Sequence, residues 1–189
     1  MKIETQILYQ TAIKFATSKH LEKEQKVPGT DLPYVVHLSN VAMEILIASA
    51  HTDNFNVGFA VQVALLHDTI EDTSATFDEL KNTFGIEIAN AVSSLTKNNS
   101  LPKEKQMQDS LQRIKKLVKE VWAVKLADRI TNLQPPPPHW DKEKKIKYKI
   151  EARTILNELQ DGNNFLARRL DASIEVYEKF VSANFVARL

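Results

Sequence analysis

Residues 61–72 carry the feature that most restricts the fold, because a mostly apolar run leads directly into four titratable side chains. These are His67, Asp68, Glu71 and Asp72. Side chains three or four positions apart share one face of a helix, so His67 should lie over Glu71 and Asp68 over Asp72. Buried charge is unfavourable unless it is paired or binds a metal. The pattern therefore predicts a buried helix that ends in a functional site rather than a solvated helix end.

The composition is that of an ordinary globular domain, with 189 residues, 43% apolar and 26% charged. We therefore expect one domain over residues 1–189. The formal net charge of +1 gives no electrostatic preference for nucleic acid or for an anionic membrane surface. There is no cysteine, which excludes disulfides, thiolate metal ligands and a cysteine nucleophile. No apolar segment has the length of a secretion signal or a membrane span, so the expected location is the cytoplasm.

Apolar residues recur at intervals of three and four along most of the chain, which predicts an all-α bundle of eight to ten helices. Thr76 and Glu79 fit a capping box, in which the Glu79 side chain would reach back to the helix start. Residues 103–116 are highly charged with weak periodicity and predict a helix with a mobile connection, which either borders the site or is simply solvated. We favour the solvated interpretation for most of the segment. The other predicted helices span 5–19, a segment that begins near His37, 56–69, 76–85, 86–95, 118–133, 141–160 and 164–180.

Two histidines and two aspartates on three of these helices could form a metal site in the bundle core. They are His37, His67, Asp68 and Asp128. Two imidazoles with two carboxylates and no thiolate suit Mn²⁺, Fe²⁺ or Zn²⁺, and suit Mg²⁺ less well. Taken singly, His37 fits an interfacial histidine, and Asp128 fits an ion-pair partner of Lys125 or Arg129. The prediction depends on the four residues together.

The same four positions resemble the metal-binding pattern of the HD phosphohydrolase superfamily. Glu71-Asp72 and residues 124–133 are more narrowly similar to the hydrolase domain of the Rel/SpoT alarmone enzymes, and the chain length resembles the stand-alone small alarmone hydrolases. The resemblance implies a single HD-type domain. It also implies an enzyme of the stringent response that hydrolyses the 3′-pyrophosphate of guanosine tetra- or pentaphosphate (ppGpp or pppGpp), usually with Mn²⁺.

A metal at such a site can activate water and polarise a phosphoryl oxygen. Glu71, or its neighbour Asp72, would take or orient a proton of that water, and we favour Glu71. By family match, Asn132 should contact the sugar or phosphates of the substrate. Tyr148 matches a family tyrosine that could stack on or bond to the nucleotide, although a packing role fits it equally well. The candidate phosphate-binding cations are Lys26, Lys97, Lys125, Arg129, Lys144 and Lys145.

Three other histidines have no partner pattern and are predicted to be surface residues. They are His20, His51 and His139. Alarmone hydrolases also usually carry an Arg-Lys pair before Pro-Tyr, where the arginine helps to hold the guanine. Val27-Pro28 stands there in this chain, and Lys26 could replace the pair in part. Base preference is therefore open.

Three hypotheses follow from these residues: an alarmone pyrophosphohydrolase, an HD-type nucleotidase or phosphodiesterase that acts on a different nucleotide, and a non-catalytic nucleotide sensor. The intact Glu71-Asp72 pair and the full metal set speak against the sensor. The native metal, the oligomeric state and the physiological role are not determined by the sequence.

Overall fold

A computed structural model describes residues 3–182, which form ten α-helices and one 3₁₀ turn with no strand among them. This confirms the predicted all-α fold. The elements are α1 (Ile3–Leu21), α2 (Val35–Ser49), α3 (Val57–Leu66), α4 (Thr69–Asp72), α5 (Phe77–Phe84), α6 (Ile86–Leu95), α7 (Lys103–Ile114), α8 (Lys119–Asn132), α9 (Lys142–Leu159), η1 (Gln160–Gly162) and α10 (Asn164–Ser182).

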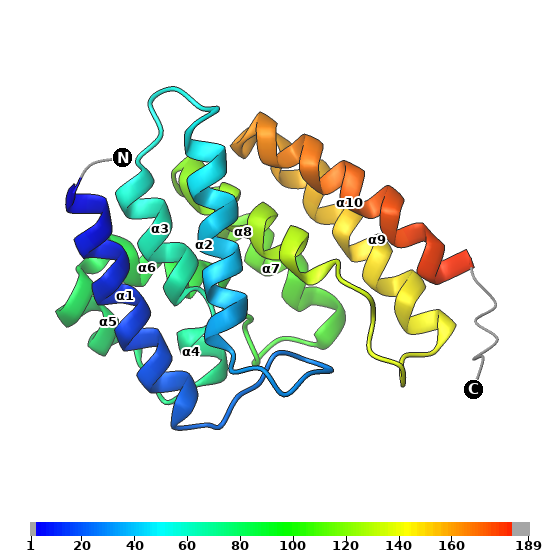
Figure 1. Cartoon of the computed structure of the whole chain (residues 1–189), viewed down its shortest axis with the longest axis horizontal. Helices are drawn as coiled ribbons and strands as arrows, with labels where there is room; N and C mark the ends of the chain where they lie inside the picture. The colour runs from blue at the N-terminus through cyan, green and yellow to red at the C-terminus, as the bar shows by residue number, and fades with distance from the viewer. Residues whose placement is uncertain (1–2, 183–189) are drawn as a thin grey trace.

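No residue of helix α3 is exposed, and the helix packs against α1, α2, α6 and α8 (Figure 1). Its residues Val63, Ala64, Leu65 and Leu66 are all fully buried. They belong to one hydrophobic core, to which α9 and α10 also contribute from a neighbouring antiparallel pair. A helix that is apolar on every side is stable only inside the protein. The core therefore fixes the positions of His67 and Asp68, which follow Leu66.

The predicted helix 56–69 is interrupted, because α3 ends at Leu66 and α4 begins at Thr69. Side chains supply the reason. His67 Nδ1 lies 2.8 Å from the Ala64 carbonyl oxygen, and the Thr69 hydroxyl donates to the Leu66 carbonyl at 2.7 Å. Such side-chain bonds compete with the backbone ladder of a helix. The expected stacking of His67 over Glu71 on one continuous helix is therefore wrong, although Asp72 N–H still donates to the Asp68 carbonyl at 2.9 Å.

The capping box is only half confirmed. The Thr76 hydroxyl accepts a hydrogen bond from the Glu79 N–H at 3.2 Å, as expected for the cap of α5. The Glu79 carboxylate instead forms an ion pair with Lys19 of α1 at 2.8 Å. The link joins α5 to α1, which the local pattern could not indicate.

A turned loop joins α1 to α2 and lies beside the end of α4. Backbone hydrogen bonds from Val27 to Leu32 and from Tyr34 to Gln25 close it, at 2.9 and 3.1 Å. Its tip needs Gly29, whose φ of +77° lies in the left-handed region that other residues rarely adopt. The loop therefore holds Gln25 and Tyr34 side by side on the α4 side of the molecule.

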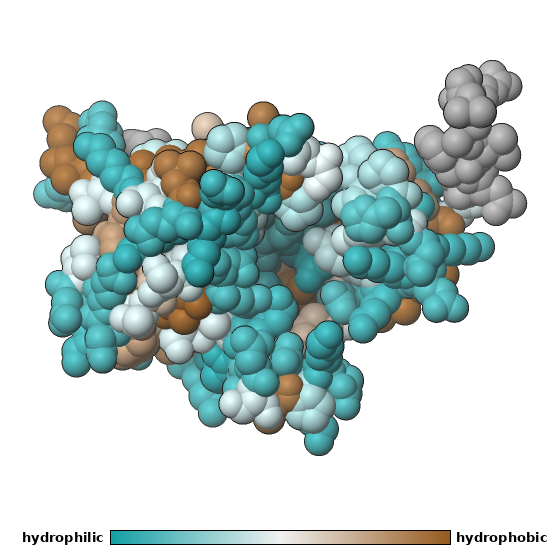
Figure 2. All heavy atoms as spheres, turned by 90° about the horizontal axis from the view of Figure 1, so that it is seen from below, coloured by the Kyte–Doolittle hydropathy of each residue, from teal (hydrophilic) through white to brown (hydrophobic). Residues whose placement is uncertain are grey.

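Charged and polar residues cover most of the face seen in Figure 2, which is hollowed near its centre. Among residues 3–182, no helix is both long enough and apolar enough to cross a bilayer.

We expect Leu65→Ala to lower the free energy of unfolding by about 2–5 kcal/mol, because the fully buried side chain leaves a cavity. Denaturant unfolding measures this change. Leu21→Ala is the control, since Leu21 is 57% exposed and its loss should change stability by about 0.5 kcal/mol or less. Equal effects of the two substitutions would contradict the central position of α3.

Candidate active site

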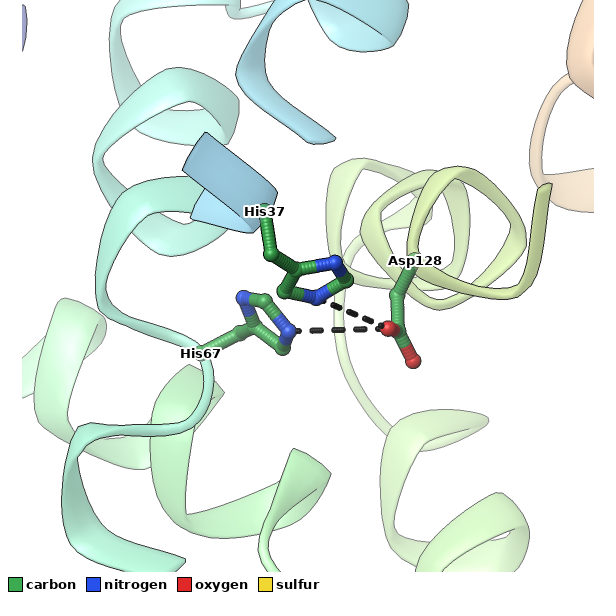
Figure 3. A group of neighbouring side chains, drawn as sticks. All are labelled: His37, His67 and Asp128. Carbon is green, nitrogen blue, oxygen red and sulfur yellow. Dashed lines mark ion pairs between the residues drawn. The ribbon is translucent and has the colours of Figure 1, made fainter. Parts of the chain in front are cut away.

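Three side chains from separate segments converge on one point beside the end of α3. His37 comes from the first turn of α2, His67 follows α3, and Asp128 lies in α8. The Asp128 Oδ1 atom is 3.5 Å from His37 Nε2 and 3.6 Å from His67 Nε2, and both rings face it (Figure 3). All three residues are buried, with one potential ligand atom of each within 4.8 Å of the others.

Asp68 adds a second carboxylate to this cluster. Its Oδ2 atom lies 2.9 Å from His67 Nε2 and 3.9 Å from His37 Nε2. Two atoms that share an ion at about 2.1 Å each stand about 3 to 4 Å apart, and these spacings agree with that. The structure thus brings together the four residues predicted to be metal ligands.

Both histidines point an Nε2 atom into the cluster. A carbonyl can only accept a hydrogen bond, so the contact of His67 Nδ1 with the Ala64 oxygen places the ring proton on Nδ1. His67 Nε2 is then free to bind a metal in the neutral ring. Within residues 3–182, neither His67 Nε2 nor His37 Nε2 makes a hydrogen bond, although both are buried. Orphaned buried acceptors of this kind fit a site for a divalent ion.

The charges of the cluster depend strongly on one another. Burial raises the pKa of both carboxyl groups, but His67 beside Asp68 and Lys125 beside Asp128 outweigh it. The pKa of each carboxyl therefore lies well below its usual range. Burial also lowers the pKa of His67, yet the two carboxylates reverse this and raise it well above 6.5. Without an ion, the acids draw a proton onto the ring, and a bound cation would replace that proton.

Glu71 and Asp72 follow on α4 and have different partners. The Glu71 carboxylate accepts from the Lys97 backbone N–H at 2.9 Å and from the Lys97 ammonium at 2.5 Å. The Asp72 carboxylate accepts from the Gln25 amide at 2.9 Å. Burial, and next the nearby Asp68, raise the pKa of Asp72. Both acids line the cavity described next.

A cavity of about 360 Å³ opens beside the histidine–aspartate cluster, which consists of His37, His67, Asp68 and Asp128. Many of the predicted site residues line it. They are Asp68, Glu71, Asp72, Lys97, Lys125, Asp128, Arg129, Asn132 and Tyr148. The cavity therefore joins the carboxylates of the cluster to cationic and aromatic side chains from α8, α9 and the loop after α6.

Three predicted cations are not among the cavity lining. Lys26 pairs with Asp31 at 2.7 Å, and Lys144 lies 4.5 Å over the Trp140 ring. Lys145, near the start of α9, is the third. Lys26, in the α1–α2 loop, and Lys144, in the first turn of α9, therefore each contact a neighbour in the sequence and do not line the cavity.

On α8, the Asp128 carboxylate accepts hydrogen bonds from two neighbouring side chains. Lys125 Nζ lies 2.9 Å from Asp128 Oδ2, and Asn132 Nδ2 donates to Asp128 Oδ1 at 2.5 Å. Arg129 is buried with its guanidinium 4.4 Å over the Tyr148 ring, and its Nε and Nη1 have no partner within residues 3–182. Burial raises the pKa of Tyr148 to about 12. Unused guanidinium donors beside a cavity suit an anionic ligand.

Two features of the site were not assigned to particular residues from the sequence. Tyr34 is buried, and its hydroxyl donates to Asp68 Oδ2 at 2.5 Å. Its place three residues before His37 was the available signal. One face of α7 also lines the cavity, through Lys103, Gln106, Met107, Ser110 and Leu111. Residues 103–116 therefore border the site along that face, which was the less favoured of the two alternatives.

The family model described as HD domain matches residues 12–170. The chain belongs to the HD domain family. This agrees with the resemblance in the sequence, and the matched region includes both the histidine–aspartate cluster and the cavity.

Two relatives and one solved structure align with this chain over most of their length. The chain is 28% identical to guanosine-3′,5′-bis(diphosphate) 3′-pyrophosphohydrolase MESH1 of Drosophila melanogaster, over 86% of this chain and 90% of that protein. It is 32% identical to the protein of the same name from Danio rerio, over 88% and 91%. A solved structure described as a metazoan ortholog of SpoT that hydrolyzes ppGpp superimposes with a TM-score of 0.76 at 27% identity, covering 89% of this chain and 94% of that one.

We expect the protein to retain Mn²⁺ through gel filtration and His67→Ala to lose it. Added Mn²⁺ should stabilise the unaltered protein by about 2.7 kcal/mol at a hundredfold excess over its Kd, and should not stabilise the variant. Metal analysis and thermal unfolding measure both effects. His139→Ala is the control, since His139 is exposed. Equal Mn²⁺ retention by the His67 variant would exclude the cluster as the metal site.

Proposed function

We propose that this protein is a metal-dependent pyrophosphohydrolase that removes the 3′-pyrophosphate of ppGpp or pppGpp. The observation that carries the proposal is the cavity, which places the histidine–aspartate cluster next to cationic side chains. A phosphorylated nucleotide needs both groups, one at the reacting phosphorus and the other around the phosphate oxygens. The names of the relatives from Drosophila melanogaster and Danio rerio support the same reaction.

His37, His67, Asp68 and Asp128 would hold the ion. Two imidazoles and two carboxylates suit Mn²⁺, Fe²⁺ or Zn²⁺, and we propose Mn²⁺ because the family resemblance implies it. The bound ion would supply Lewis-acid polarisation of a phosphoryl oxygen and a lowered pKa of water. The chain itself supplies the support behind these ligands. The Ala64 carbonyl fixes the His67 tautomer, Tyr34 orients Asp68, and Asn132 orients Asp128.

Glu71 is the proposed proton acceptor for the attacking water. Water adds to the phosphorus next to the ribose, the bond from phosphorus to the 3′ oxygen breaks, and pyrophosphate leaves. The water must lose a proton and the 3′ oxygen must gain one. Glu71 lines the cavity on the same side as Asp68, with Lys97 holding both its oxygens in place. Asp72, whose pKa is raised, is the second acid and a suitable donor to the leaving oxygen.

Cations on the cavity wall would bind the phosphates. Arg129 has an ion pair with Glu151 at 3.9 Å through Nη2 but keeps Nε and Nη1 unused, whereas Lys97 and Lys125 are closely paired with Glu71 and Asp128. An incoming phosphate would share these ammonium groups rather than find them free. Tyr148, which lies over Arg129, offers an aromatic face to the nucleotide.

A second candidate substrate class is kept for one reason. Lys26, the residue expected to compensate for the missing Arg-Lys pair, is paired with Asp31 outside the cavity lining. A different phosphorylated nucleotide could therefore be the better substrate at the same metal site. The cytoplasmic location and the single domain over residues 1–189 stay predictions.

A nucleotide panel with added Mn²⁺ tests the function. We expect release of pyrophosphate from ppGpp and pppGpp, detected by product chromatography, and no reaction after chelation of the metal. Turnover only of other phosphorylated nucleotides would support the second substrate class. Tight binding of ppGpp without cleavage in the presence of metal would contradict both and favour a sensor.

We expect Glu71→Gln to lower kcat by about 10²-fold or more, the range of general acid–base effects, while Mn²⁺ stays bound. Single-turnover kinetics and metal analysis measure the two properties separately. Glu87→Gln is a matched control, because Glu87 lies on α6 outside this cavity. An unchanged kcat in Glu71→Gln would remove Glu71 from the mechanism.

A further inference from the structure

A third histidine is buried behind the site, and neither the histidine–aspartate cluster nor the cavity lining includes it. His20, at the end of α1, is 2% exposed, which makes the prediction of a surface histidine wrong. Its Nδ1 atom lies 2.5 Å from Gln25 Oε1, and its Nε2 is buried without a partner among residues 3–182. A buried polar atom left unpaired costs stability. The ring therefore occupies this place for some reason other than packing.

Gln25 connects His20 to Asp72. Its amide nitrogen lies 2.9 Å from Asp72 Oδ2, and its amide oxygen faces the His20 ring. When Asp72 is ionised it can only accept, so in that state the amide nitrogen points to Asp72 and the amide oxygen to His20. His20 must then carry its proton on Nδ1. Burial lowers the pKa of His20, which favours a neutral ring with one N–H. The three side chains thus form a chain of donors and acceptors with one consistent direction.

The same ring also supports Asp68. It lies against Tyr34, with ring centroids 4.8 Å apart, and the Tyr34 hydroxyl donates to Asp68 Oδ2. His20 therefore contacts both hydrogen-bond donors: Gln25, which donates to Asp72, and Tyr34, which donates to Asp68. His20 lies at the end of α1, Gln25 and Tyr34 lie in the α1–α2 loop, and the two carboxylates lie at α4, which is distant in the sequence.

We infer that His20 and Gln25 are positioning residues that orient Asp72 for proton transfer, with His20 acting through the Gln25 amide. The inference rests on the proposed function, since Asp72 has a role only if the cavity carries out hydrolysis. Gln25 supplies the donor and His20 fixes the rotamer and amide orientation of Gln25. Orientation of an acid by such partners affects the chemical step more than substrate binding.

Two substitutions of Gln25 test the donor. Gln25→Glu keeps an acceptor for His20 but removes the donor to Asp72, and Gln25→Met keeps only the volume. We expect both to lower kcat at least tenfold, with KM within twofold and Mn²⁺ content unchanged. Gln62→Met is the matched control, because Gln62 is also half-buried but donates to the Gly58 carbonyl within α3. A kcat within twofold of the unaltered protein, or a change confined to KM, would overturn the inference.

Two substitutions of His20 test its role behind Gln25. In His20→Asn the side-chain amide replaces the Nδ1 donor, so kcat should stay within threefold, whereas His20→Ala should lose at least tenfold. Equal losses in both variants, with thermal unfolding unchanged, would show that His20 only fills space. If neither variant folds, the Gln25 variants decide alone.

Nitrogen NMR of the histidine rings gives a readout that does not depend on activity. We expect His20 to be protonated on Nδ1 in the unaltered protein, and Gln25→Met to shift that signal. A proton on Nε2 would overturn the inference. The unaltered protein is assayed first: no pyrophosphate release from ppGpp would count against the proposed function, whereas normal activity with unaffected Gln25 variants would count against this inference alone.

Discussion

The packing of buried Asp128 and half-buried Asp68 next to two buried histidines is the interaction on which the rest of the structure depends. Removing a carboxylate from water costs several kcal/mol unless partners replace the lost solvation. Asp128 has Lys125 and Asn132 as such partners, and Asp68 has Tyr34. The apolar helices α2, α3 and α8 pack tightly enough to hold these groups at fixed distances. A looser scaffold would admit water and would no longer direct the histidine nitrogens toward one point.

Much of this arrangement could be predicted from the sequence because it follows from short-range patterns. Helical periodicity located the core helices, and an apolar run that ended in His67 and Asp68 indicated a buried polar site. Asp128 could be added because it lies on a core helix with polar neighbours at helical spacing. These inferences need only the geometry of a helix and the cost of buried charge.

What could not be predicted depends on contacts between residues that are distant in the sequence. Gln25 and Asp72 are 47 positions apart, and no local pattern indicates that they meet. His20 ends an amphipathic helix in a polar segment, which is typical of a surface residue, yet the α1–α2 loop folds over it. The break after Leu66 was missed for a different reason, since the side-chain bonds of His67 and Thr69 compete with a backbone pattern that periodicity assumes to be continuous.

Acidic and basic side chains of the cavity form ion pairs whose two members differ in exposure. In both lysine pairs the carboxylate is the more buried partner: the side chain of Asp128 is 9% exposed against 20% for Lys125, and that of Glu71 is 19% against 57% for Lys97. The pair of Arg129 with Glu151 has the opposite order, 10% against 30%. The carboxylates are therefore presented to the interior, where a cation would lie, and the amines to the opening, where phosphates would arrive. An ion held by Asp68 and Asp128 would weaken the hold of Asp128 on Lys125 and leave the charge of Lys125 to the substrate. Metal and nucleotide should therefore bind cooperatively, since each relieves the charge imbalance that the other creates.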